Sequence, residues 1–336
     1  MGSNIAPLIA PFQVPTTLPR GEVVAIDGNN AVMQAMTKSI AGTAMGTWRD
    51  RAGNPVAHLY GILNRTTGIL QAGAWPLFVF DGKATDAKQR KDYDRIKAYT
   101  NAQRNITRAQ HAVDMQYATW LKDRPAYFWP KVFREVRDLL AFLGCPYLPA
   151  PGEGEAQAAF LCMIGAAAGV ISQDYDTLLF GSPRLYRRLQ GPKATYGEIR
   201  LNHVLCELRI SREQLVDVSI LAGNDFHPGI EGIGPRMALK LIQLHGSIES
   251  IPTRVKERYD FSALPPDKIE QVRRTFLAPD ICTDVPKPAW RAPSREHLLR
   301  LCCHDHHLSE QRVSRAVDRW IRALRHASLV PSSRFF

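Results

Sequence analysis

The sequence lacks the features that would place this chain in a membrane or outside the cell. No apolar run approaches the roughly eighteen residues needed to span a bilayer, and no signal-like segment opens the chain. Its 6 cysteines form no recognisable disulfide framework in 336 residues, which is typical of a reducing environment. We therefore expect an intracellular protein with no membrane partner.

Internal repeats and low-complexity linkers are also absent. A chain of 336 residues is long enough to bury a sizeable core, and the lack of a linker favours one integrated domain over two. We expect this domain to be a monomer.

Negative charge is in the minority, because 43 Lys and Arg residues face 32 Asp and Glu residues and the formal net charge is +11. Such an excess predicts a polyanionic partner, such as nucleic acid. Charge alone would equally serve solubility. The placement of the acidic residues therefore carries more information than their number.

Acidic residues recur at the ends of apolar segments. The runs Val23–Ile26 and Pro76–Phe80 lead into an Asp, and residues 169–171 lead into an Asp-x-Asp pair. Because the carboxyl ends of parallel strands share one rim of a sheet, we expect four acids at that rim. An extended pair would also aim both Asp side chains to one side. These four residues are Asp27, Asp81, Asp174 and Asp176.

Three further acids complete the set. Glu153 and Glu155 open an Ala-rich helical run, and Asp225 follows the predicted helix 213–222. A single acid of this kind is more often a helix cap or a surface ion pair, but caps do not explain the whole set. Like charges this close raise one another's pKa unless cations neutralise them. The sequence therefore predicts a site for Mg²⁺ or Mn²⁺ in an α/β protein.

The framed acids resemble the metal-binding blocks of a known family. These blocks are residues 25–31 (AIDGNNA), 79–82 (VFDG), 150–156 (APGEGEA), 172–181 (SQDYDTLLFG) and 223–225 (GND). In order and spacing they are similar to the flap endonucleases of the archaeal and eukaryotic type. Those enzymes are structure-specific 5′ nucleases of the group that includes the XPG nucleases. The resemblance runs from Met1 to about Leu324.

The resemblance implies a PIN-like 5′-nuclease fold, with a mixed, largely parallel central sheet flanked by helices, a helical arch and a helix-two-turn-helix segment. We expect a single domain with six successive parts. Residues 1–110 carry metal ligands and a basic helix, residues 111–130 form a divergent cap, and residues 131–225 carry further metal ligands. The helix-two-turn-helix follows at 226–250, C-terminal helices at 251–325 and a tail at 326–336.

It also implies two Mg²⁺ ions, for which Mn²⁺ can substitute. Asp27, Asp81, Glu153 and Glu155 would hold one ion, and Asp174, Asp176 and Asp225 the other. Two ions about 3.5–4 Å apart would serve the attacking water and the leaving oxygen of a phosphodiester.

A basic stretch follows Asp81, without Gly or Pro between Gly82 and Pro125. Lys88 and Arg95 are seven residues apart and so share one helix face. The resemblance assigns these two residues to the scissile phosphate, whose transition-state charge they would stabilise. For the other basic residues of this stretch, a solvated helix surface is the better interpretation.

Closely spaced glycines at 229–236 precede a predicted helix at 237–244. Gly232 and Gly234 would let the backbone approach a DNA phosphate, and Arg236 and Lys240 would contact phosphates from the helix. The resemblance adds a K⁺ ion bound through backbone oxygens here. Without the resemblance, a glycine turn between two helices is the default interpretation.

Three places depart from the family pattern. Residues 108–130 carry aromatic side chains, with Pro125 and Pro130 as expected breaks; these aromatics would stack on unpaired bases or pack on one another. Met33 replaces a tyrosine that stacks on a base, and it is either a base contact or a core residue. In the tail, Leu329 and Ser332 replace residues of a sliding-clamp motif, so clamp binding is doubtful.

We expect a metal-dependent nuclease that acts on branched DNA, such as a 5′ flap or a nicked duplex, in replication or repair within the nucleus or nucleoid. A 5′-3′ exonuclease or an RNase H-like nuclease that removes primers remains an alternative, because it would share every metal ligand. A non-catalytic DNA-binding scaffold is a further alternative. It would be expected to lack at least one ligand, whereas all seven acids are present.

Overall fold

The computed structural model describes residues 3–37, 49–51, 54–82, 105, 125–189 and 195–328. The chain divides into two compact units. The first comprises Met1–Pro19, Val23–Asp27 and Ala150–Thr283, and the second comprises Arg20–Glu22, Gly28–Pro149 and Asp284–Phe336. Among the described helices, none combines the length and apolar character that crossing a bilayer requires.

The first unit contains a run of five strands in the order β1-β7-β6-β5-β2. Their bounds are β1 (Val14–Thr16), β2 (Val23–Asp27), β5 (Val170–Ile171), β6 (Arg184–Arg188) and β7 (Tyr196–Arg200). β2 pairs with β5, and β5 with β6, in parallel, whereas β7 pairs antiparallel with β6 and β1. All five residues of β2 are buried, because apolar side chains cover it on both faces.

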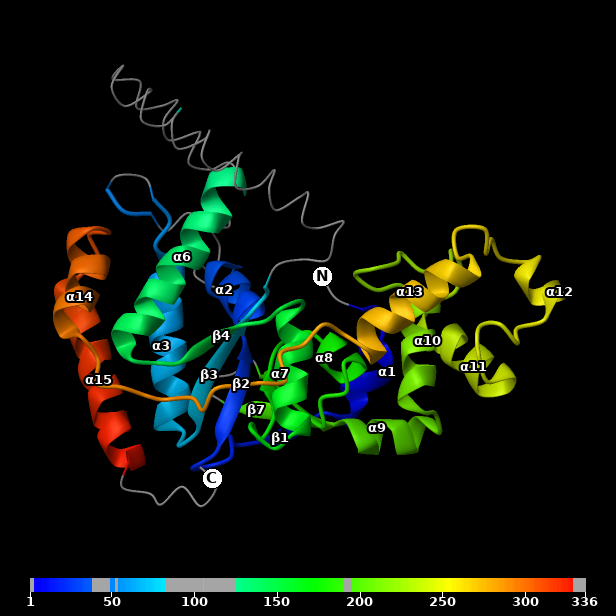
Figure 1. Ribbon diagram of the computed structural model, residues 1–336, viewed down its shortest axis with the longest axis horizontal. Helices are drawn as coiled ribbons and strands as arrows, with labels where there is room; N and C mark the ends of the chain where they lie inside the picture. The colour runs from blue at the N-terminus through cyan, green and yellow to red at the C-terminus, as the bar shows by residue number, and fades with distance from the viewer. Residues whose placement is uncertain are drawn as a thin grey trace. The chain divides into compact units, whose positions relative to one another are not determined.

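Helices complete the first unit. They are α1 (Ala6–Ile9) with the 3-10 turn Ala10–Phe12, α7 (Gly154–Met163), α8 (Asp176–Leu179), α9 (Leu201–Leu208), α10 (Arg212–Ala222), α11 (Pro235–His245), α12 (Thr253–Lys256) and α13 (Pro266–Leu277). A Ser211–Gln214 capping box starts α10, whose second half is fully buried. The helices α11 and α13 both pack on α10 (Figure 1).

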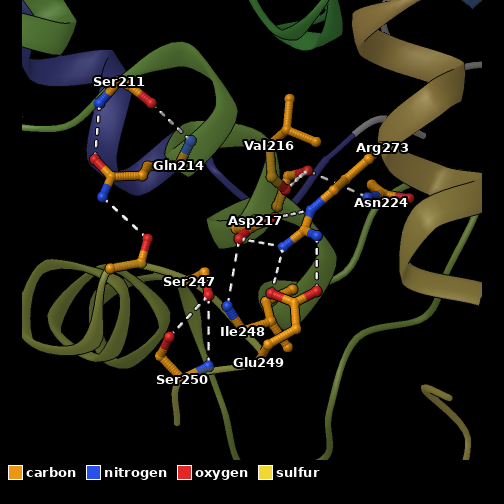
Figure 2. A network of polar contacts seen from close by, with 12 residues as sticks. Ser211, Gln214, Val216, Asp217, Asn224, Ser247, Ile248, Glu249, Ser250 and Arg273 are labelled. Carbon is orange, nitrogen blue, oxygen red and sulfur yellow. Dashed lines mark hydrogen bonds and ion pairs between the residues drawn. The ribbon is translucent and has the colours of Figure 1, made fainter. Parts of the chain in front are cut away.

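An ion-pair network joins α10, α13 and the turn after α11 (Figure 2). Arg273 donates from Nε and Nη2 to the two carboxylate oxygens of Asp217, at 2.6 and 2.7 Å. The same guanidinium donates to Glu249 at 2.7 and 2.9 Å. Nearby, the Gln214 amide donates to the Gly246 carbonyl at 3.0 Å. These contacts fix the end of α11, which belongs to the predicted helix-two-turn-helix segment.

The second unit contains the parallel strands β3 (Trp75–Phe80) and β4 (Tyr147–Pro149). Its helices are α2 (Gly28–Thr37), α3 (Ala57–Gln71), α6 (Pro125–Leu143), α14 (Arg295–Leu299), the π-helical turn Arg300–His304 and α15 (Glu310–Ser328). α15 packs beside α3 (Figure 1). The indole of Trp320 is fully buried and donates to the Leu143 carbonyl at 2.9 Å.

Buried charge in the second unit gathers around Glu135 of α6. Lys131 pairs with its carboxylate, and ring nitrogens of His58 and His306 lie 2.9 and 3.0 Å from the carboxylate oxygens. Burial alone would raise the pKa of Glu135, but the hydrogen bonds from His306 and His58 and the charge of Lys131 outweigh it and hold the pKa well below its ordinary value. Burial lowers the pKa of His58.

The predicted α/β class, with mixed and largely parallel strand pairing, is confirmed. One expectation within it was wrong. Pro130 does not break the chain but lies inside α6, whereas Pro125 begins this helix. A proline in the second turn removes one backbone hydrogen bond, and the packing of the rest of α6 tolerates this loss. Trp129 packs on Phe133 of the same helix, with ring centroids 6.2 Å apart.

Candidate metal centre

Asp27 ends β2 and lies beside the end of β5. In the parallel register Ile26 is opposite Ile171, so Asp27 and Ser172 are the next residues on neighbouring strands. The Ser172 hydroxyl lies 2.9 Å from Oδ2 of Asp27 and 3.4 Å from Oε1 of Glu155. Strand pairing thus brings together acids that are far apart in the sequence.

Asp174 and Asp176 follow β5, but the segment between them is not extended as predicted. Tyr175 has helical dihedral angles and Asp176 is the first residue of α8. The helix start folds the backbone back, and the Asp176 amide donates to Oδ1 of Asp174 at 3.3 Å. The Asp174 amide donates to the Ser172 hydroxyl at 3.0 Å. A helical turn, rather than strand alternation, brings the two carboxylates together.

Asp225 is placed by the turn that ends α10. Gly223 has a φ of 101°, and a Cβ there would lie 2.6 Å from the Pro228 carbonyl oxygen, so only glycine fits. The side chain of Asn224 then accepts hydrogen bonds from the amides of Phe226 and His227 at 2.9 and 3.0 Å. Carboxylate oxygens of Asp174, Asp176 and Asp225 lie within 4.8 Å of one another.

The two glutamates lie at the start of α7. Glu153 is its N-cap residue and Glu155 is in its first turn. Glu155 contacts Ser172 as described, and its carboxyl group interacts electrostatically with Asp27, Asp174 and Asp176. Six of the seven predicted acids belong to the first unit, and five of them interact electrostatically as one group.

The negative charges of these carboxylates repel one another. Burial, followed by repulsion from Asp176, raises the pKa of Asp174 to about 7. Burial, followed by repulsion from Asp27, raises the pKa of Glu155, and burial raises that of Asp176. A divalent cation fits these residues, because carboxylate oxygens are hard ligands and a bound cation removes the repulsion. The acidic triad Asp174, Asp176 and Asp225 can hold such an ion.

The seventh acid, Asp81, belongs to the second unit and follows β3 directly. Its carboxylate accepts a hydrogen bond from the side-chain amide of Asn29, and its own amide donates to Oδ1 of Asn29 at 3.3 Å. Asn29 comes from the first turn of α2, so a helix start orients this acid.

The predicted DNA contacts are found as follows. Gly234 is the N-cap of α11, Gly232 has a φ of 81°, and the side chains of Arg236 and Lys240 are exposed on that helix. Met33 is 40% exposed on α2, so it is not a core residue. Lys88, Arg95, most of the 111–130 cap segment and the 329–336 tail lie outside the described residues.

Three residues near the acids were missed by the sequence analysis. Ser172 holds Asp27 and the backbone of Asp174, and Asn29 orients Asp81. The amide of Ser3 donates to Oδ1 of Asp176 at 3.0 Å. A polar residue directly after a strand was a usable signal for Ser172. Ser3 carried none, because 173 positions separate it from its partner.

Comparison with known proteins gives consistent matches. Residues 5–102 match the XPG N-terminal domain and residues 144–225 match the XPG I-region. Flap endonuclease 1 of Pyrobaculum arsenaticum is 38% identical over 322 residues, which cover 90% of this chain and 90% of that protein. Flap endonuclease 1 of Zea mays is 35% identical over 304 residues, covering 89% of this chain and 79% of that protein.

Among solved structures, flap endonuclease-1 from Methanococcus jannaschii matches with a TM-score of 0.71 at 26% identity. The match covers 94% of this chain and 98% of that chain. Similarity in sequence and in fold therefore extends over nearly the whole chain.

Proposed function

Since this chain belongs to the flap endonuclease family of the XPG nucleases, we propose that it is a structure-specific endonuclease that cleaves 5′ flaps near junctions of single-stranded and double-stranded DNA. The reaction is the hydrolysis of a phosphodiester bond, leaving a 5′-phosphate and a 3′-hydroxyl. The observation that carries the proposal is the convergence of Asp174, Asp176 and Asp225, whose carboxylate oxygens lie within 4.8 Å of one another.

Two Mg²⁺ ions are the proposed cofactors, and Mn²⁺ is the proposed substitute. Asp174, Asp176 and Asp225 hold one ion, while Asp27, Asp81, Glu153 and Glu155 hold the other. When bound, the ions supply an activated water and stabilise the leaving oxygen. The protein's own part is to keep the acids oriented, and the hydrogen bonds of Ser172 to Asp27 and to the Asp174 amide support this role.

The proposed substrate contacts are made by basic, glycine and methionine residues. Lys88 and Arg95 hold the scissile phosphate, and Met33 contacts a base. Gly232, Gly234, Arg236 and Lys240 hold the phosphates of duplex DNA, with a K⁺ ion on the backbone of this segment. The exposure of Arg236 and Lys240 on α11 supports phosphate contact, because exposed cations bind the DNA backbone without reading sequence.

The protein is proposed to act as a monomer in replication or repair, in the compartment of the cell that contains DNA. A sliding-clamp contact is not proposed, because the sequence of the tail departs from the clamp motif at Leu329 and Ser332.

The test compares three 5′-labelled DNA substrates, which are a double flap, a nicked duplex and an unpaired single strand, each with Mg²⁺ and with EDTA. Metal-dependent release of the intact flap, much faster than loss of label from the other two, is expected. Mononucleotide release from the nicked duplex would instead identify an exonuclease. A fourth substrate, a nicked duplex with an RNA 5′ end, is added to test the alternative. Preferential removal of this RNA would identify a primer-removing nuclease.

The matched variants are Asp174→Asn and Asp138→Asn. Asp138 is an exposed acid on α6, so its substitution should leave cleavage unchanged. Asp174→Asn should abolish cleavage but leave flap binding measurable by fluorescence anisotropy in Ca²⁺. Full cleavage activity of Asp174→Asn would show that the proposed metal site at Asp174, Asp176 and Asp225 is not needed for the reaction. Binding without cleavage by the unmodified protein on all three substrates would indicate the scaffold.

A further inference from the structure

The second unit contains a cavity of about 530 Å³ between the C-terminal end of α3 and the C-terminal half of α15. These two helices lie side by side in Figure 1. Four basic side chains line the cavity, and the described residues that line it include no acid. The four are Arg20, Arg319, Arg322 and His326. None of the seven acids assigned to the metal centre is among the lining residues.

Two of the arginines are held in place by uncharged neighbours. Nη2 of Arg319 donates to Oδ1 of Asn64 at 2.6 Å, and the Asn64 amide in turn donates to the Tyr60 carbonyl at 2.8 Å. The stem of Arg20 lies against Gly73, whose φ is 95°. A Cβ at Gly73 would lie 2.8 Å from Cγ of Arg20. The guanidinium of Arg319 is thus oriented by an uncharged side chain, and the stem of Arg20 is positioned by its contact with Gly73.

No ion pair within the described ranges involves Arg20, Arg319 or Arg322. Guanidinium groups that share a cavity repel one another, so an anion between them lowers the free energy. Guanidinium has a planar array of donors that matches the oxygens of a phosphate group, and such charged hydrogen bonds are among the strongest in proteins.

The floor of the cavity is apolar. Leu70, Ala323 and Ala327 line it and are 2%, 8% and 9% exposed. An apolar floor strengthens the electrostatic attraction above it and offers a surface to a flat, uncharged group. A volume of about 530 Å³ falls within the range of roughly 300–1,000 Å³ that is typical of small-molecule sites.

We propose that this cavity binds a phosphate-bearing ligand of mononucleotide size. Arg20, Arg319 and Arg322 hold the phosphate group, and the base or sugar lies on the floor formed by Leu70, Ala323 and Ala327. Such a group exists both in a free nucleotide and at the end of a nucleic-acid strand. The inference is independent of cleavage, because it rests only on residues of this cavity.

The test is calorimetric titration of the full chain with dAMP and with inorganic phosphate, in EDTA so that no cleavage occurs. The double variant Arg20→Gln/Arg322→Gln should bind dAMP at least about tenfold more weakly, since each charged hydrogen bond contributes about that factor. The matched control Arg312→Gln/Arg315→Gln removes the same charge from exposed positions of α15 outside the cavity. It should change the affinity by less than about twofold.

A second variant changes the shape and keeps the charge. Ala323→Leu fills part of the floor, so it should weaken dAMP binding at least about tenfold while circular dichroism shows an intact fold. Three results would overturn the proposal. They are an unchanged dAMP affinity in the cavity variants, a loss of dAMP affinity in the control as large as in the cavity variants, and no dAMP binding to the native protein at millimolar concentration. Inorganic phosphate binding as tightly as dAMP would overturn the role of the floor.

Competition distinguishes the two sources of the ligand. A 5′-phosphorylated single-stranded oligonucleotide that displaces dAMP from the native protein, and equally well from the control variant Arg312→Gln/Arg315→Gln, indicates a strand end as the natural ligand. An oligonucleotide that leaves dAMP bound indicates a free nucleotide. Both results support a phosphate site.

Discussion

Substitution of Arg273 by methionine should strongly destabilise the first unit. The Asp217 carboxylate is only 5% exposed, and Arg273 supplies two of its hydrogen bonds. Without the guanidinium, the one remaining hydrogen bond of Asp217 to a described residue is the 3.4 Å contact with the Ile248 amide. Leaving a buried charge without its partner costs about 3–5 kcal/mol. Glu249 adds little, because its side chain is 50% exposed. We expect Arg273→Met to lower the free energy of unfolding by about 3–4 kcal/mol.

The pH dependence of this loss has a definite sign. Burial raises the pKa of Asp217, and Arg273 partly offsets this effect. In the variant the offset is gone, so the pKa rises further and acid protonates the carboxyl group in the folded state. A raised folded pKa means that the folded state binds more protons than the unfolded state, so the penalty is lifted as pH falls. The deficit of Arg273→Met should therefore be smaller at pH 5 than at pH 7.

The assay is urea unfolding followed by far-ultraviolet circular dichroism. The described tryptophans all belong to the second unit, so circular dichroism reports on the first unit better than tryptophan fluorescence; they are Trp75, Trp129, Trp290 and Trp320. Arg274→Met, an exposed neighbour on α13, is the control and should change stability by less than about 0.5 kcal/mol. The double variant Asp217→Asn/Arg273→Met should be more stable than Arg273→Met, because it removes the unpaired charge. A double variant no more stable than Arg273→Met would refute the reasoning.

Two other substitutions test the remaining networks. Ser172→Ala removes the hydrogen bonds to Asp27 and the Asp174 amide, so it should reduce the rate of flap cleavage about tenfold in saturating Mg²⁺; an unchanged rate would separate Ser172 from the site. Glu135→Gln should lower the free energy of unfolding by about 3–5 kcal/mol at pH 7, since it leaves buried Lys131 unpaired. Because the folded pKa of Glu135 is depressed, its charged form stabilises the protein above pH 4.5 and this contribution is lost as pH falls further. The deficit of Glu135→Gln measured by urea unfolding should thus narrow below about pH 4.5, and a constant deficit would contradict this role.

The strands that carry the acids were predictable because they are short, fully apolar runs. Val23–Asp27 and Trp75–Phe80 have no polar residue before their final or following acid, and a parallel strand buried on both faces requires this pattern. The position of Asp27 beside the end of β5 followed from one further rule, that parallel strands end at the same rim.

Other details were not predictable from local pattern. The pairing of Ser172 with Asp27 depends on the register of β2 with β5, and sequence separation hides that register. The helix start at Asp176 depends on the packing of α8 against α7, which overrides the extended geometry expected after a strand. The helical position of Pro130 depends in the same way on the packing of the later turns of α6.

The path of the chain has a consequence for dissecting this protein. The polypeptide passes between the two units five times, at residues 19/20, 22/23, 27/28, 149/150 and 283/284. Neither unit is a continuous stretch, so no truncation or single proteolytic cut yields either one whole. Asp27 stands directly at one of these passages and residues 150–155 directly after another. Expressing one unit alone would therefore cut the backbone next to acids of the proposed metal centre, so these acids can be studied together only in the full chain.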